Sequence, residues 1–156
     1  MLSMSELAMN PERKVTTVCY GKKQEWDDRE EAQAFFRKDL YATENGIVLD
    51  EYTENGSVCS VELTDHHKNA EGGVMGGVML TLIDFSFATA ACNVHRPTVA
   101  QQISMNFLNQ PRGNRLTARS SCRKDGKTSC IYQIDIKDDL GNDIAQAVVT
   151  GFKIVR

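Results

Sequence analysis

The spacing of hydrophobic and polar residues changes along the 156-residue chain, and each change marks a new element. Residues 1–26 are mostly polar and show no periodicity, so we expect a loose leader before a single domain at 27–156. In 29–40, apolar residues recur at helical spacing, and Asp27 or Asp28 stands at the N-cap position. The pattern predicts a short amphipathic helix there.

The most apolar stretch lies within residues 69–92 (NAEGGVMGGVMLTLIDFSFATAAC), where a glycine-rich turn precedes a long helical pattern. At helical spacing nearly every face is apolar: Val78, Leu82, Phe85, Ala88 and Cys92 form one face, and Met79, Ile83, Phe87 and Ala90 fill most of the rest. Such a helix is expected to be buried. Asp84 stands in its middle, and desolvating a lone carboxylate is costly, so we expect donors, a raised pKa or a wet cleft beside it. Such positions are where function is usually found.

The rest of the chain has the pattern of β-strands. Alternating or β-branched runs predict strands at 47–53, 57–63, 98–108, 115–123, 128–137 and 143–155. Asn55-Gly56 is a hairpin signal between the first two strands, and glycine-containing turns separate the last four, so we expect an antiparallel meander. One sheet wrapped around one apolar helix buries both, which predicts an α+β fold.

Composition excludes several classes of protein. A net charge of −3 argues against a nucleic-acid binder, which is normally basic. No run of about 18 apolar residues predicts a membrane span, and the first residues lack the features of a secretory signal. The cysteines are odd in number and lack a CxxC pair, so we expect reduced thiols in a cytoplasmic protein without a zinc site. They are Cys19, Cys59, Cys92, Cys122 and Cys130.

The element order and the start of the central helix resemble the hotdog fold, and within it the acyl-CoA thioesterase branch related to the phenylacetate-pathway thioesterase. That branch has an Asn, a short glycine turn, His-Gly-Gly and then Leu-x-Asp on the helix. Those places are held here by Asn69, Gly76, Gly77, Leu82 and Asp84. The strands of 103–154 are similar too, and the resemblance covers roughly 45–156. One departure is Met75, where the family most often has histidine.

This resemblance implies hydrolysis of a medium-chain or aromatic acyl-CoA without metal or bound cofactor. Asp84 is then the nucleophile or general base, the N–H groups near Gly77 hold the oxyanion at a helix N-terminus, and Asn69 orients the water or the carboxylate. Met75 and Gly76 are expected beside the acyl group. In the family the glycine turn of one chain faces the carboxylate of the other, which implies a homodimer or a dimer of dimers.

Basic residues gather in the predicted hairpins, and the turn with Arg123, Lys124 and Lys127 is our candidate for holding the phosphates of coenzyme A. The alternative is a solvated turn that blunts strand edges. The expected partner is therefore an acyl-CoA, and neither nucleic acid nor membrane is expected.

Other functions have weaker support. His66 and His67 with Asp65 suggest a metal site, but adjacent residues rarely point at one ion. No Gly-x-Ser-x-Gly elbow supports a serine triad, and no histidine, including His95, matches that of the hotdog dehydratases. Two alternatives remain: a hotdog protein that binds acyl-CoA or another apolar ligand with little turnover, suggested by Met75, and an assembly module without ligand.

Overall fold

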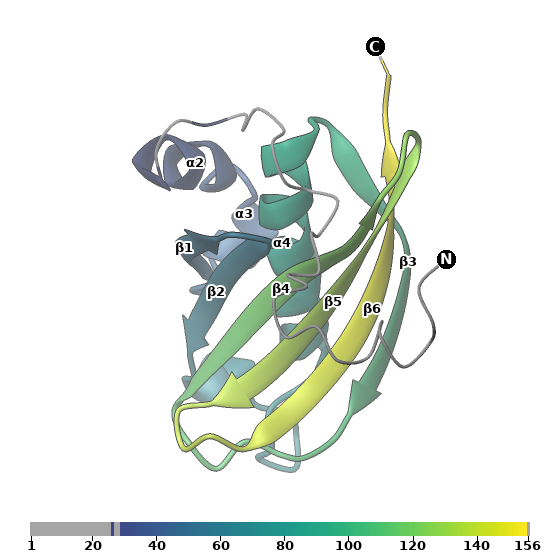
Figure 1. Cartoon of the computed structure of the whole chain (residues 1–156). Coiled ribbons are helices and arrows are strands. Elements are labelled where there is room, and N and C mark those ends of the chain that lie inside the picture. The colour runs from purple at the N-terminus through teal and green to yellow at the C-terminus, as the bar shows by residue number, and fades with distance from the viewer. Residues whose placement is uncertain (1–25, 27–28, 156) are drawn as a thin grey trace, which may run out of the picture.

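The computed structural model describes Trp26 and residues 29–155, and it shows one antiparallel sheet curled around one long helix (Figure 1). The predicted α+β architecture is confirmed. The remainder of the predicted leader and the proposed cap at Asp27 or Asp28 lie outside the described residues.

The sheet has six strands, and each begins and ends within two residues of its predicted range. They are β1 (Val48–Thr53), β2 (Gly56–Glu62), β3 (Thr98–Phe107), β4 (Arg115–Asp125), β5 (Ser129–Asp138) and β6 (Asp143–Lys153). Their spatial order is β1-β2-β4-β5-β6-β3, and every neighbouring pair is antiparallel. The edges are therefore β1 and β3.

The predicted meander of the last four strands is wrong for the first of them. β4, β5 and β6 follow one another, but β3 pairs with β6, for example Ile103 with Val149. The segment 108–114, which contains Pro111, is too long for a tight hairpin, so it crosses the end of the sheet. β4 pairs instead with β2, which leaves β3 at the far edge.

The predicted helix over 29–40 is two short helices, α2 (Arg29–Phe36) and α3 (Leu40–Thr43). Phe36 is buried, and the chain turns directly after it, where the N–H of Asp39 donates to the Phe36 carbonyl at 3.0 Å. The Asp39 carbonyl then accepts N–H groups from both Ala42 and Thr43, which starts α3. The single stripe of apolar residues concealed this break.

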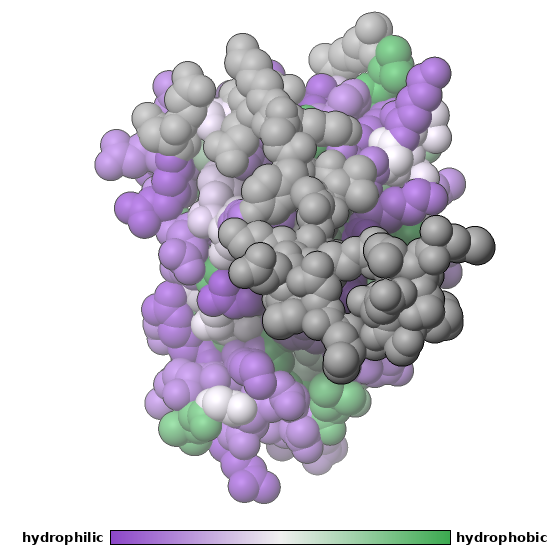
Figure 2. Space-filling view, in the orientation of Figure 1, coloured by the Kyte–Doolittle hydropathy of each residue, from purple (hydrophilic) through white to green (hydrophobic). Residues whose placement is uncertain are grey.

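The long helix α4 (Gly76–Val94) forms the core with the inner face of the sheet. On β5, Cys130, Tyr132, Ile134 and Ile136 are all buried, as their alternation predicts. The Phe87 ring of α4 packs edge-on against Tyr132, with centroids 5.6 Å apart. By length and composition α4 could cross a membrane, but most of it is buried inside the fold. The face in Figure 2 is mainly hydrophilic where it is not grey.

The predicted burial of α4 is confirmed for most of its length, but one stripe stays uncovered. The exposed residues are Gly77, Leu80 and Asp84. They lie on one face of the helix, because two helical turns separate Gly77 from Asp84. The sheet wraps the remainder of the helix but does not close over this stripe. Asp84 is therefore accessible in the single chain rather than sealed in the core.

The cysteines also differ from expectation. Cys59, Cys92 and Cys130 are buried and form no disulfide, as expected for reduced thiols. Cys122 is disulfide-bonded, so the prediction that every thiol is reduced is wrong at this position. Spacing along the sequence carries no information on which cysteines approach one another in space.

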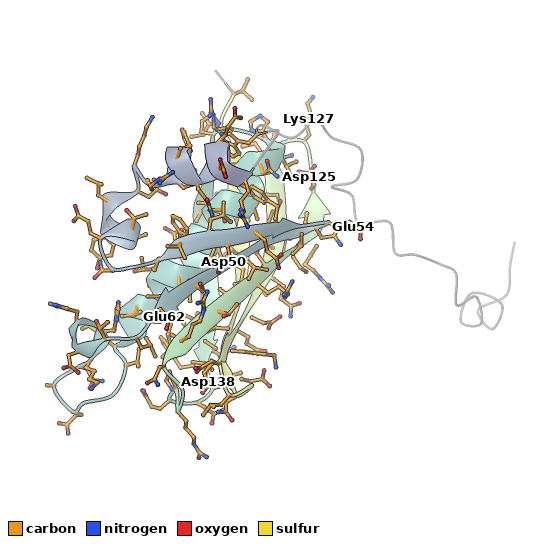
Figure 3. The ribbon with its side chains drawn as sticks, turned by 90° about the vertical axis from the view of Figure 1, so that its left-hand side faces the viewer. Asp50, Glu54, Glu62, Asp125, Lys127 and Asp138 are labelled. Atoms are coloured by element: carbon orange, nitrogen blue, oxygen red, sulfur yellow. The ribbon has the colours of Figure 1, made fainter. Side chains whose placement is uncertain are left out.

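Buried charges secure both ends of the sheet (Figure 3). At one end Lys153, which is 4% exposed, pairs with Asp125 and donates to the Gly126 carbonyl at 2.8 Å, which fixes β6 to the β4–β5 hairpin. At the other end Asp138 accepts backbone N–H groups from Arg112, Gly113, Leu140 and Asn142, and a further bond from the Asn142 amide. Hydrogen bonds from these groups hold the pKa of Asp138 well below its usual range. This carboxylate joins the crossing segment after β3 to the β5–β6 hairpin.

We predict that Lys153→Met destabilises the fold, because it removes the buried ammonium group that pairs with the Asp125 carboxylate. Breaking a buried pair on one side typically costs about 3–5 kcal/mol of unfolding free energy. The matched control is Lys137→Met, which removes an exposed pair with Asp143 and should change stability little. Urea denaturation of both variants measures the effect, and equal midpoints for the two would contradict the prediction.

Candidate active site

Asp84 lies in a groove between α4 and the edge strand β3. The groove has a volume of about 570 Å³. It is lined by Tyr41, Gly77, Leu80, Thr81, Asp84, Ala100, Gln101, Gln102 and Ile103. The uncovered stripe of α4 forms its floor, β3 forms one side, and Tyr41 reaches it from α3. The wet cleft expected beside Asp84 is therefore present.

The groove alters the acidity of Asp84. Loss of hydration among the surrounding groups raises the pKa of Asp84, and the negative charge of Asp39 raises it further. The pKa of Asp39 is itself raised by desolvation. A carboxylate with a raised pKa accepts a proton more readily than a free one, which suits a general base.

The start of α4 offers backbone donors. Met75 is its N-cap, and the Val78 N–H already donates to the Met75 carbonyl at 3.0 Å. The N–H groups of Gly76 and Gly77 make no hydrogen bond to the described part of the chain. At a helix N-terminus such donors favour negative charge. This is the chemistry required of an oxyanion hole.

The two glycines at the start of α4 differ in the space around them. A Cβ at Gly76 would lie 3.0 Å from the ring of Phe107 on β3, so the helix approaches the strand closely only without a side chain. A Cβ at Gly77 would meet nothing within 4 Å, so the space on the side-chain side of its Cα is open.

The loop before α4 is organised by Asn69. Its side-chain oxygen accepts the N–H groups of Glu71 and Gly73, each at 3.0 Å, and its own N–H donates to the Gly73 carbonyl. Gln110, from the crossing segment, accepts the Val74 N–H at 3.1 Å and so ties the loop to the end of β3. The side-chain oxygen of Asn69 thus has a structural role. Its amide NH₂ group makes no hydrogen bond to a described residue, so the predicted catalytic role rests on that group.

Asn69 and Asp84 lie in separate cavities of one chain. A cavity of about 390 Å³ lies between the glycine-rich loop and the end of β3. It is lined by Asn69, Val74, Gly76, Met79, Phe107, Leu108, Asn109 and Gln110. Gly77 and Asp84 share the other groove, but seven residues separate them, a distance of about 10 Å along a helix. A single thioester carbonyl does not contact both groups within one chain.

The other predicted site residues lie elsewhere. Met75 is 56% exposed at the N-cap and is not among the described residues that line either cavity. Arg123, Lys124 and Lys127 are exposed at the β4–β5 hairpin. Figure 3 shows Lys127 at the end of the sheet opposite Glu62 and Asp138, far from the start of α4 in this chain. Their roles toward the acyl group and the phosphates stay predictions.

His67 supports the glycine-rich loop. It is 4% exposed, its Nδ1 accepts the Thr64 N–H at 2.9 Å, and its Nε2 therefore carries a proton and donates to the Asn45 carbonyl at 2.7 Å. Its own carbonyl accepts the Met75 N–H at 2.8 Å. Among the described residues there is no group of three metal-ligating side chains, so nothing there supports a metal site at His66 and His67.

Sequence reasoning missed Asp39 and Tyr41. Both belong to the turn and helix that interrupt the predicted helix at 29–40, a segment outside the resemblance. The signal was the run of polar residues Arg37, Lys38 and Asp39 near the end of that segment, which interrupts the apolar stripe between Phe36 and Leu40.

Comparisons with known proteins agree with the fold. Residues 71–145 match the model of the thioesterase superfamily. The acyl-coenzyme A thioesterase PaaI of Escherichia coli is 28% identical over 115 residues, which cover 73% of this chain and 82% of that protein. Over this segment, residues 71–145, the chain is similar to the thioesterase superfamily. Within it, the chain resembles the phenylacetate-pathway hotdog branch, as the sequence motifs predict.

Solved structures confirm the hotdog fold. The E. coli PaaI protein of the phenylacetic acid degradation operon superposes with a TM-score of 0.75 at 25% identity, covering 81% of this chain and 92% of that one. A mutant thioesterase from Pseudomonas aeruginosa has a TM-score of 0.76 at 18% identity and covers 84% of this chain and 97% of that one. A hypothetical thioesterase with coenzyme A from Streptococcus pneumoniae has a TM-score of 0.70 at 20% identity and covers 78% of this chain and 98% of that one.

We predict that Asp39→Asn lowers the pKa of Asp84, because it removes a nearby negative charge. The pKa should stay above the ordinary value, since desolvation is the larger cause. Carboxyl NMR titration of Asp84 measures this without requiring activity. Glu44→Gln, at the other end of α3, is the control and should leave the titration of Asp84 unchanged. An unchanged Asp84 titration in Asp39→Asn would refute the coupling.

Proposed function

We propose that the protein is an acyl-CoA thioesterase that acts on medium-chain or aromatic acyl groups as a cytoplasmic homodimer or dimer of dimers. The observation that carries the proposal is the accessible carboxylate of Asp84, with a raised pKa, in a groove beside an edge strand. The name of the E. coli relative supports an acyl-CoA substrate, and so does the structure of the S. pneumoniae thioesterase with coenzyme A.

Two copies complete the site. The edge strand β3 has unpaired backbone groups on its outer side, and pairing with β3 of a second copy would satisfy them. The groove adjoins this edge, so the pairing brings the α4 helices of both copies together. Asp84 of one chain then faces Gly77 of the partner subunit. One carbonyl can therefore contact both groups, although within one chain they lie about 10 Å apart. Each dimer has two such sites.

The chemistry follows from this pairing. The thioester carbonyl oxygen accepts hydrogen bonds from the N–H groups at the start of α4, which stabilise the negative charge that develops on it. Asp84 either attacks the carbonyl carbon, forming an anhydride that water later hydrolyses, or removes a proton from an attacking water. In both routes the C–S bond breaks, coenzyme A leaves as a thiol after protonation, and the acyl group leaves as a free acid.

A second candidate is a hotdog protein that binds acyl-CoA and scarcely turns it over. The observation that favours it is Met75, a thioether at the family's usual histidine position, which supplies no proton. Hydrolysis of a panel of acyl-CoAs, followed by detection of the released thiol, separates the two functions. Binding without thiol release would favour the second candidate.

We predict that Asp84→Asn lowers turnover of the preferred acyl-CoA by at least about 10²-fold, because it removes both nucleophile and base. The fold should survive, since Asp84 lies on an accessible stripe and an amide is cheaper to desolvate than a charge. The measurement is the hydrolysis rate beside the thermal midpoint. Asp135→Asn on β5 is the control. The Asp135 carboxylate accepts a hydrogen bond from the Gln133 side-chain amide, and the amide oxygen of Asn can accept the same bond. Parental activity in Asp84→Asn would overturn the assignment, and unfolding would make the carboxylate structural.

We predict that inactive Asp84→Asn and Gly77→Pro chains regain activity when their subunits exchange. Proline at the first turn of a helix is tolerated but removes the N–H, whereas Gly77→Ala keeps that donor and serves as the control. Half of the randomly mixed dimers carry one intact site of two, so activity should return to about a quarter of the parental value. If exchange is demonstrated by mass spectrometry and activity stays absent, each site is built within one chain.

A further inference from the structure

A third cavity lies beneath the two short helices at the start of the domain, and the chemistry above does not use it. Its volume is about 370 Å³. It is lined by Gln33, Phe36, Arg37, Thr43, Ile47, Val48, Leu49 and Phe85. These residues come from α2, α3, β1 and α4, and we call the space the α2–α3 cavity. Figure 1 shows α2 and α3 beside β1 and α4, where they cover the edge of the sheet.

The walls of the α2–α3 cavity suit an apolar ligand. Phe36 and Phe85 pack edge-on with centroids 5.9 Å apart, and Ile47 and Leu49 are buried. The polar group of Gln33 is already engaged, because its amide donates to the Leu49 carbonyl at 2.6 Å. The volume falls within the range of about 300–1,000 Å³ typical of small-molecule pockets.

The cavity and the Asp84 groove are neighbours across one short helix. Phe85 follows Asp84 directly, and successive helical residues point about 100° apart, so α4 presents one side chain to each space. On α3, Tyr41 lines the groove and Thr43 lines the cavity. The four-residue helix α3 is therefore the partition between them.

This partition is weakly held. A single helical turn has little stability of its own, and the N-cap Asp39 makes no side-chain capping bond. Leu40 and Tyr41 are 58% and 77% exposed, so the outer side of α3 lacks packing. A displacement of α3 would join the two spaces.

We propose that the acyl group of a thioester held at Asp84 passes beneath α3 and lies in the α2–α3 cavity. This inference rests on the proposed thioesterase function and places acyl-length selection in a segment before residues 71–145, which carry the superfamily match. The occupant is the acyl tail because five of the eight lining residues are apolar and the cavity adjoins the groove that holds the reacting carbonyl.

The test uses two variants of Val48, one that narrows the cavity and one that widens it. This side chain is 49% exposed on the edge strand β1, so Val48→Trp places an indole at the cavity with little cost to folding. For a panel from acetyl-CoA to decanoyl-CoA and phenylacetyl-CoA, kcat/KM should fall about 10-fold or more for the large acyl groups only. Val48→Ala should shift the preference toward larger groups. Val148→Trp is the control, since Val148 is 48% exposed on β6 and is not among the residues that line the cavities.

Two outcomes overturn the inference: equal changes for acetyl and decanoyl substrates, or no change in either Val48 variant. If the parent hydrolyses none of the substrates, the thioesterase proposal fails. Calorimetry of ligand binding then tests whether the cavity holds an acyl tail. Tighter binding of decanoyl-CoA than of coenzyme A, abolished by Val48→Trp and retained by Val148→Trp, supports it. Equal binding of decanoyl-CoA and coenzyme A refutes it.

Discussion

The packing of one apolar helix against one curled sheet is the interaction on which the rest of the structure depends. The sheet buries most of α4, including Leu82, Ile83 and Phe87, and thereby fixes which residues remain outside. The uncovered stripe with Gly77 and Asp84 is thus a consequence of the core rather than a separate feature. Because the stripe adjoins the unpaired edge strand β3, the position where a second copy would add its strand is also the position of the candidate active site.

The two ends of α4 are supported by different means. At its start, the loop from Asn69 to Met75 is held by the buried His67, by Gln110 and by its own turn. Near its other end, the Lys153–Asp125 pair fixes the adjoining hairpin and strand. This support keeps the backbone donors of the glycine turn in place before a ligand arrives, which is the condition for strong stabilisation of a developing oxyanion.

Much of the fold was accessible from the sequence because periodicity reports burial. The alternation of Cys130, Tyr132, Ile134 and Ile136 predicted an inward face that the structure confirms. The position of β3 beside β6 was not accessible, because the strand pattern says which face is buried and not which strand is the neighbour. Likewise the apolar run of α4 could not show that the sheet leaves one stripe open, since that depends on how far the sheet curls.

The candidate site was predictable only in part. The motif placed Gly77 at the start of α4 and Asp84 in its middle, as the structure has them, but Tyr41 lines the groove and Asp39 affects Asp84 from a segment with no motif. The separation of Asn69 from Asp84 is a tertiary property that spacing does not reveal. Together these facts make a site shared between two copies the simplest arrangement that brings the donors and the carboxylate to one carbonyl.

The most direct test is a crystal structure of the protein with a non-hydrolysable thioether analogue of an acyl-CoA. We predict that the acyl carbonyl position lies within hydrogen-bond distance of the Gly77 N–H of one chain and beside Asp84 of the other. A carbonyl bound by Gly77 and Asp84 of the same chain, or a ligand bound away from the α4–β3 groove, would contradict the shared site.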